Sequence, residues 1–330
     1  LELTPSTADR SHRYKKIVLD SAAAERLFMD LFLQAHQRPP KSIVLDLDAT
    51  DDPLYGKQEG RFFHGYYLNY CYLPLYIFCG EFLLCAKLRR SNIDASAGAV
   101  DELDRIVGQI RAAWPRTRIL VRGDSGFCRE PLMLWCEDQE NVEFLFGLAK
   151  NERLIKRIAK PLRQARKVCQ RTGAAARVFA DFQYQTRDSW AWKRRVVGKA
   201  EHLPQGANPR FIVTSIPAEK IDAATLYEQH YCARGDMENR IKETQLALHA
   251  DRAGSRAFRA NQLRLWLSAL AYVLLQALRE VGLAGSEMAR AQCGTIRLKL
   301  LKIGGSVRAS ARRLWLSLSA GYPHQRLFRG

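Results

Sequence analysis

The hydrophobic and polar positions in the first part of the chain change between helical and strand spacing. Apolar residues recur every three or four positions within 21–39, which predicts an amphipathic helix that two prolines end. Residues 42–48 are a short apolar run and predict a buried strand. Residues 64–78 are aromatic and β-branched, and we expect them to form an antiparallel hairpin with residues 82–87 across a turn at Gly80.

The next segments alternate between helix and strand. Helical spacing occurs in residues 97–113 and 131–137, and strand-like runs occur in 118–121 and 142–148. Antiparallel strands followed by parallel strands and helices predict an α/β fold, namely a ribonuclease-H-like mixed sheet flanked by helices. Other mixed α/β folds begin in the same way.

The second half of the chain has a different pattern. Strand-like stretches at 177–186, 190–198 and 210–216 are joined by Gly, Pro and Asn turns, and predict a β-rich insertion before a mostly helical region. We therefore divide the chain into an N-terminal helical segment (1–40), the first part of a core (41–150), the basic insertion (151–215), a helical second part of the core (216–283) and a basic C-terminal segment (284–330).

Charge is distributed unevenly over the 330 residues, of which 47% are hydrophobic, enough for a folded core. Lys and Arg outnumber Asp and Glu by 52 to 34, a net charge of +18. Residues 1–150 hold 19 basic and 21 acidic side chains, whereas residues 151–330 hold 33 basic and 13 acidic ones. This asymmetry predicts chemistry in the first half and binding of a polyanion by the second. A generally basic protein with no such partner is the alternative.

The cysteines and the longest apolar run indicate a cytoplasmic protein. Eight cysteines are scattered without a C-x-x-C pair, which argues against a zinc knuckle or a small disulfide scaffold. The run from 263 to 278 is interrupted by Arg264 and Gln276 and is too short to cross a bilayer. No secretion signal is visible, so we expect no membrane partner.

Carboxylates occur where a sheet of this kind would bring them together. Asp46 and Asp48 are two residues apart on a predicted strand and therefore project from the same face. Asp124 follows a later strand, next to glycines that allow close approach of a ligand. Glu238 lies on a predicted helix. Carboxylates from separate elements suit Mg²⁺, which prefers oxygen ligands.

The helix that carries Glu238 has a polar stripe. Tyr231, Arg234, Glu238 and Lys242 are separated by three, four and four residues, so they line one helical face. Basic side chains beside a carboxylate cluster would hold a phosphodiester backbone.

Three motifs together resemble the DDE transposases of bacterial insertion sequences. They are Asp48-Ala49-Thr50 after an apolar strand, Gly123-Asp124-Ser125-Gly126-Phe127, and Tyr231-x2-Arg234-x3-Glu238. The chain is most similar to the cut-and-paste family numbered thirteen-eighty, from about residue 40 onward. The wider signature continues with x6-Lys after the Glu, where this chain has Gln245. Lys242, one turn after Glu238, could replace the phosphate contact of that lysine.

The resemblance implies a ribonuclease-H-like core in which Asp48, Asp124 and Glu238 hold Mg²⁺, or Mn²⁺ in its place, as two ions. Such enzymes cleave the phosphodiester at a transposon end and transfer the 3′ end to target DNA. The implied partners are double-stranded DNA, with terminal inverted repeats and target sites, and a second copy of the chain in a homodimer.

The resemblance also implies DNA contacts outside the three acids. Tyr231 and Arg234 would contact DNA near the cleaved end. In some relatives an aromatic residue of the insertion stacks on a flipped base, and Trp190 or Trp192 could serve here. The chain begins with Leu rather than Met, so residues 1–40 could be the remnant of a truncated DNA-binding region.

Two other functions fit parts of the pattern. Asp46-Leu47-Asp48-Ala49-Thr50 also matches the opening motif of haloacid-dehalogenase-like phosphatases, with Asp46 as nucleophile and Asp48 as general acid. That fold requires a helical crossover after the motif, where we expect a hairpin. A DNA-binding protein without catalysis would explain the charge but not the acids. Within the transposase interpretation the Asp-small-Thr pattern favours Asp48 over Asp46 as the first ligand.

Overall fold

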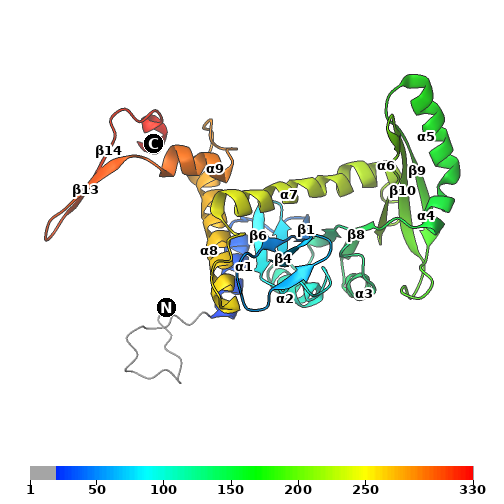
Figure 1. Cartoon of the computed structure of the whole chain (residues 1–330), viewed down its shortest axis with the longest axis horizontal. Helices are drawn as coiled ribbons and strands as arrows, with labels where there is room; N and C mark the ends of the chain where they lie inside the picture. Colours follow the sequence, from blue (N-terminus) through cyan, green and yellow to red (C-terminus); the bar gives the residue numbers. More distant parts are fainter. Residues whose placement is uncertain (1–19, 330) are drawn as a thin grey trace, which may run out of the picture.

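A computed structural model describes residues 20–329 of the chain. Its centre is a mixed sheet in the order β6-β5-β1-β7-β8, with β1 parallel to β7, β7 parallel to β8, and β5 antiparallel to both β1 and β6 (Figure 1). This is the ribonuclease-H-like arrangement that the sequence predicts. The five strands are β1 (Ser42–Ala49), β5 (Leu75–Cys79), β6 (Phe82–Lys87), β7 (Arg118–Gly123) and β8 (Val142–Leu148).

Helices cover both faces of this sheet. On one face α1 (Ser21–Gln34), α2 (Ala99–Ala113) and α3 (Glu130–Asp138) pack against the strands, and Leu45 and Leu47 of β1 lie in this hydrophobic cluster. The other face is covered by helices from the second half of the chain. Because side chains alternate along a strand, Asp46 and Asp48 face these later helices. The N-terminal segment expected at 1–40 is described only from residue 20.

The predicted strand at 64–78 is wrong in part. Only β5 joins the main sheet, where it forms the expected hairpin with β6. The preceding residues form a separate small sheet of β2 (Asp52–Pro53), β3 (Phe62–His64) and β4 (Asn69–Tyr72). The chain reverses between β3 and β4 through Leu68, which has a φ of 54°. The aromatic composition of the whole segment concealed this turn, because it contains only one glycine.

The insertion extends the central sheet. It contains β9 (Ala176–Tyr184), β10 (Arg194–Leu203), β11 (Gly206–Ala207) and β12 (Arg210–Thr214), and β12 pairs antiparallel with β8. Two helices that the sequence pattern did not reveal, α4 (Glu152–Arg157) and α5 (Ala159–Thr172), precede these strands. The expected strand at 190–198 begins only at Arg194, so Trp190 and Trp192 lie in the loop between β9 and β10.

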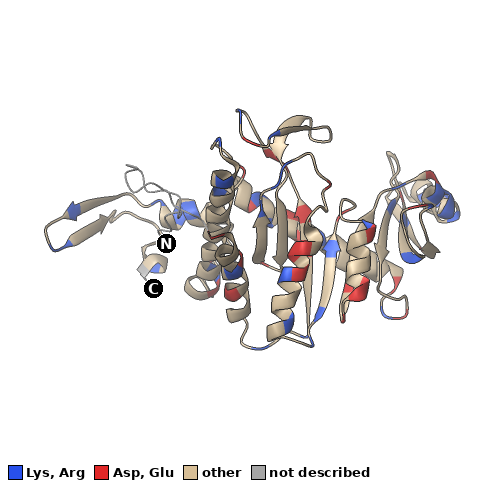
Figure 2. Ribbon diagram, turned by 90° about the horizontal axis from the view of Figure 1, so that it is seen from below, with Lys and Arg blue, Asp and Glu red and all other residues tan. Residues whose placement is uncertain are grey.

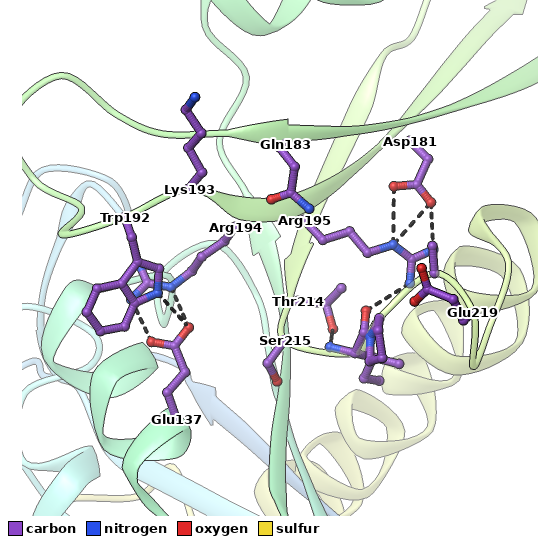
Figure 3. Close-up of a pocket in the computed structure, with 13 residues that line it drawn as sticks. Glu137, Asp181, Gln183, Trp192, Lys193, Arg194, Arg195, Thr214, Ser215 and Glu219 are labelled. Atoms are coloured by element: carbon purple, nitrogen blue, oxygen red, sulfur yellow. Dashed lines mark hydrogen bonds and ion pairs between the residues drawn. The ribbon is translucent and has the colours of Figure 1, made fainter.

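Arg194 fastens the insertion to the core. Its side chain is almost fully buried and donates hydrogen bonds to Glu130 and Glu137 of α3, at 2.6–3.2 Å and 2.7–2.8 Å respectively. The guanidinium carbon also lies 5.6 Å from the ring centre of Trp190. It lies 5.0 Å from the ring centre of Trp192, which Figure 3 shows beside Arg194. Two carboxylates and two aromatic rings therefore fix this loop against α3.

Helices follow the insertion in the second half of the chain, and the central one is irregular. Five consecutive elements make one long helix across the sheet (Figure 1). They are α6 (Ala223–Thr225), the π-helix η1 (Leu226–Tyr231), the 3₁₀ turn η2 (Cys232–Arg234), α7 (Gly235–Lys242) and the π-helix η3 (Glu243–Ala247). Such changes of turn within a helix often mark functional positions.

The following helix, α8 (Phe258–Ala277), continues into the π-helix η4 (Leu278–Gly282). Within residues 20–329 this is the single helix with the length and apolar composition of a membrane span. Its Trp266 and Tyr272 are buried in one cluster with Met237 of α7 and Phe78 of β5. It therefore serves as a core helix of this fold.

The C-terminal segment ends in an exposed β-ribbon that projects from the body (Figure 1). Its elements are α9 (Cys293–Ile296), the π-helix η5 (Arg297–Leu301), β13 (Gly305–Ala309), β14 (Leu314–Leu318) and α10 (Gln325–Arg329). The sequence from Met288 to Gly330 contains nine Lys and Arg residues and no Asp or Glu. The ribbon is therefore basic, as Figure 2 shows for its strands and turn.

Candidate active site

The parallel pairing of β1 with β7 places two of the predicted acids side by side. The register aligns Asp46 with Arg122 and Leu47 with Gly123, and Asp48 and Asp124 are the next residues of the two strands. Both carboxylates therefore lie at the same edge of the sheet, where parallel strands end. In the ribbon of Figure 2, acidic positions are marked on the central elements of the molecule.

Asp48 lies in an environment that opposes its negative charge. Burial is the main reason that the pKa of Asp48 is raised, to about 7; Arg234 lowers this pKa, and the carboxylates of Asp124 and Glu238 raise it. Asp124 and Glu238 are therefore near enough to Asp48 to act on its charge. This concentration of negative charge is balanced within the protein mainly by one guanidinium.

That guanidinium belongs to Arg234, which lies between two of the acids. Its Nη1 is 3.5 Å from Oδ1 of Asp48, and its Nη2 forms an ion pair with Oε1 of Glu238 one turn away. The charges of Asp48 and Glu238 raise the pKa of Arg234 although burial lowers it. The Glu238 side chain is 42% exposed, so it remains open to a further ligand.

The three predicted acids do not form a closed metal site in the structure. Within residues 20–329, no three His, Cys, Asp or Glu side chains lie close enough together to hold a metal ion by themselves. Asp124 instead turns back, and its Oδ1 accepts a hydrogen bond of 2.8 Å from the backbone of Gly126. The donor chemistry still fits a divalent cation, because three carboxylates with one guanidinium between them prefer a hard cation.

Tyr231 closes one side of this edge by packing on a glycine. A Cβ atom at Gly147 of β8 would lie 2.5 Å from the Tyr231 hydroxyl and 2.8 Å from the backbone nitrogen of Ser125. Burial raises the pKa of Tyr231, and the Asp124 carboxylate adds to this. Next to it is a cavity of about 330 Å³, whose lining includes Lys150 and Arg210.

Tyr67 is a residue near the acids that the sequence pattern did not reveal. Its hydroxyl donates to the carbonyl of Ala49 at 3.3 Å, and Asp48 and Asp124 are among the acids that raise its pKa after burial. It lies in the turn between β3 and β4. No motif marks it, because its neighbourhood depends on the small second sheet.

The lysine position of the wider signature has a structural role here. Gln245 donates hydrogen bonds from Nε2 to Oδ1 of Asp52 at 3.1 Å and to the carbonyl of Asp51 at 3.4 Å. Burial raises the pKa of Asp52 to about 8, and the hydrogen bond from Gln245 acts in the opposite direction. Lys242 is exposed on the last turn of α7.

The two tryptophans of the insertion differ in exposure. Trp190 is buried and packs edge-to-face on Tyr184 with a centroid distance of 5.8 Å. Trp192 is 47% exposed and borders a cavity of about 560 Å³ together with Lys193 and Gln183 (Figure 3). Trp190 therefore belongs to the core of the insertion, and Trp192 is accessible to a ligand.

Asp46 differs from Asp48 in its partners. Arg122 grips its carboxylate with Nε and Nη2, at 2.5 and 2.7 Å, and both side chains are buried. The chain after Asp48 forms antiparallel strands and no helical crossover. Neither feature fits the phosphatase alternative, which needs Asp46 free as a nucleophile.

The fold and the acidic edge define a ribonuclease-H-like enzyme of the DDE class. The chain matches the family described as transposase DDE domain group 1 over residues 4–330. It therefore belongs to this family of transposases, and the resemblance to insertion-sequence transposases noted in the sequence is confirmed. No curated protein matches the chain significantly.

We predict that Gly147→Ala impairs DNA cleavage. The added methyl would meet the Tyr231 hydroxyl and the fixed backbone of Ser125, so the Asp124 turn or the Tyr231 helix must shift. Overpacking of this kind costs about 1–3 kcal/mol of stability. We expect a loss of cleavage of about tenfold or more, because small displacements of reacting groups are costly. Cleavage assays and urea denaturation measure the two effects.

Gly108→Ala is the matched control for this prediction. Gly108 lies within α2, and no atom comes within 4 Å of a Cβ built there. Because Ala is the better helix former, this variant should be as stable as the wild type or more so, with unchanged cleavage. Equal activity of both variants would contradict the close approach at Gly147.

Proposed function

We propose that the protein cleaves phosphodiester bonds at transposon ends and transfers the 3′ end to target DNA. The observation that carries the proposal is the placement of Asp48 and Asp124 at the ends of two paired strands, together with Arg234, which pairs with both Asp48 and Glu238. The match to a transposase family supports the same conclusion.

Asp48, Asp124 and Glu238 would hold two Mg²⁺ ions, for which Mn²⁺ could substitute. Ions held at this edge would supply charge stabilisation for the attacking and leaving oxygens of a phosphoryl displacement. The partly exposed Glu238 is the ligand with most freedom to reorient, because within residues 20–329 only Arg234 forms an ion pair with it. Asp48 and Asp124 are fixed by adjacent strands.

The remaining side chains of the site would bind and orient DNA. Arg234 and Tyr231 face the acids and are suited to a phosphate next to the cleaved bond. Lys150 and Arg210 line the neighbouring cavity and would hold the adjacent backbone. Lys242 would contact phosphate one turn further along α7. In the insertion, the exposed Trp192 would stack on an unpaired base, whereas Trp190 supports it from the core.

Larger basic surfaces flank the site. The exposed side of α5 carries five Lys and Arg residues and no acid, and the C-terminal ribbon is also free of acids. Both ends carry blue segments in Figure 2. We propose that they bind terminal-repeat and target DNA, in a bacterial cytoplasm and in a homodimer. A DNA-binding protein without catalysis would not need the acids, which repel phosphate.

We predict that Asp48→Asn, Asp124→Asn and Glu238→Gln each abolish metal-dependent strand cleavage. Each change removes a negative ligand and nearly preserves size. We expect a loss of more than about 100-fold, above the usual cost of removing a residue that only supports a ligand. Affinity for DNA should stay equal or rise, because a charge that faces phosphate is gone. A labelled terminal-repeat duplex with Mg²⁺ or Mn²⁺ measures cleavage, and a gel-shift assay measures binding.

Asp236→Asn is the control on the same helix. Asp236 is exposed on α7, two residues before Glu238, and has no ion pair with another described residue. Its loss should leave cleavage near the wild-type rate. Retention of cleavage by Glu238→Gln, or hydrolysis of a small phosphate ester that depends on Asp46, would contradict the proposed mechanism.

We predict a steep fall of DNA affinity with salt. Each neutralised phosphate contributes about 0.9 to the slope of log K against log salt. Arg163→Gln/Arg166→Gln on α5 should therefore lower the slope by up to about 1.8. Arg116→Gln/Arg118→Gln removes the same charge near the start of β7, at the opposite edge from the acids, and should leave the slope unchanged. Equal slopes for both variants would argue against α5 as a DNA contact.

A further inference from the structure

Arg122 connects the three elements that carry the acids. It lies on β7, two residues before Asp124, and its fork grips Asp46, which lies on β1 two residues before Asp48. Its remaining amino group, Nη1, donates to the backbone carbonyl of His230 in η1, the residue before Tyr231. One buried guanidinium thus contacts β1, β7 and the helix of Glu238.

The His230 carbonyl lies at an irregular point of the helix. The helix changes there from a π-helix to a 3₁₀ turn, so its regular ladder of hydrogen bonds is interrupted. A side chain from the sheet binds the backbone at this interruption. The contact restrains the position of the helix over the sheet, because the guanidinium is planar and is itself held by Asp46.

Other interactions between this helix and the acidic edge depend on that placement. Arg234 can reach Asp48 only if the helix is correctly seated, and Tyr231 packs on Gly147 with almost no free space. We infer that Arg122, held by Asp46, is a positioning residue that sets the Tyr231–Glu238 helix against Asp48 and Asp124 for cleavage. This inference rests on the proposed function and adds to it a second, buried layer of the site.

A purely structural role makes a different prediction. A buried ion pair contributes little net stability when both partners are replaced by apolar residues, whereas removal of one partner leaves an uncompensated charge. Asp46→Leu/Arg122→Met should therefore fold with a urea midpoint close to that of the wild type. If the pair only stabilised the core, this double variant would also have the cleavage activity of the wild type.

The test compares Asp46→Leu/Arg122→Met with the wild type in three measurements. We expect the kcat for cleavage of a terminal-repeat duplex to fall about 100-fold, the loss expected from displaced reacting groups, with DNA affinity within about threefold. We also expect faster hydrogen–deuterium exchange in residues 226–238, and unchanged exchange in β1 and β7. The exchange measurement requires neither metal nor DNA.

Asp181→Leu/Arg195→Met is the matched control. Arg195 grips Asp181 with Nε and Nη2, at 3.1 and 2.6 Å, and donates from Nη1 to the carbonyl of Ile216 at 2.9 Å. Arg195 thus makes the same type of contacts within the insertion as Arg122 makes in the core, namely to one carboxylate and one backbone carbonyl (Figure 3). This variant should retain cleavage and should exchange normally in residues 226–238.

Wild-type cleavage and exchange by Asp46→Leu/Arg122→Met would overturn the inference. If that variant does not fold, Arg122→Lys decides, because it retains the charge but lacks the fork. Reduced kcat and faster exchange at 226–238 in Arg122→Lys support the inference, and wild-type behaviour overturns it. If the wild type itself does not cleave the duplex, the proposed function fails. The exchange comparison still tests whether Arg122 and Asp46 hold the helix of residues 226–238.

Discussion

The parallel pairing of β1 with β7 is the constraint on which the site depends. It brings the ends of two strands to one edge and aligns Asp46 with Arg122, so that Asp48 and Asp124 follow side by side. The two acids are far apart in the sequence, and the strand pairing brings them together. Paired positions such as Asp46 and Arg122 are separated by 76 residues. The antiparallel hairpin on one side and β8 on the other hold these strands in the middle of the sheet.

Burying acids at this edge is electrostatically unfavourable, and two arginines compensate their negative charges. Arg122 neutralises Asp46 beneath the site, and Arg234 lies between Asp48 and Glu238 at its surface. Both side chains of the first pair are buried, whereas the second set includes a half-exposed glutamate. This difference suits a scaffold that stays fixed and a ligand set that can accept cations and phosphate. The long helix contributes to both arrangements, because its His230 carbonyl accepts a hydrogen bond from Arg122 and because Arg234 belongs to it.

Sequence patterns predicted those parts of the fold that depend on local periodicity. β1, β7, β8 and α2 were recognisable because apolar residues recur at strand or helix spacing over their whole lengths. The small sheet at 52–72 was not, because the many aromatic residues in 62–72 hide its turn. The basic helix α5 was missed because only a narrow stripe, with Ala165 and Cys169 buried, faces the protein.

Prediction of the candidate site residues from sequence has the same limit, because it depends on local patterns. Asp48, Asp124 and Glu238 stand in motifs and could be proposed from sequence. Arg122 and Gln245 act through partners 76 and 193 residues away, which no local pattern reveals. The exposure of Trp192 and the burial of Trp190 likewise depend on Arg194 and its two glutamates on α3.

The proposed mechanism requires that Asp48, Asp124 and Glu238 form one cation site at this edge. Anomalous X-ray scattering from crystals of the protein bound to terminal-repeat DNA and soaked with Mn²⁺ tests this requirement most directly. We predict manganese in contact with Asp48 and Asp124, and with Glu238 once DNA is bound. Manganese at other residues only, with these three carboxylates free of metal, would contradict the mechanism.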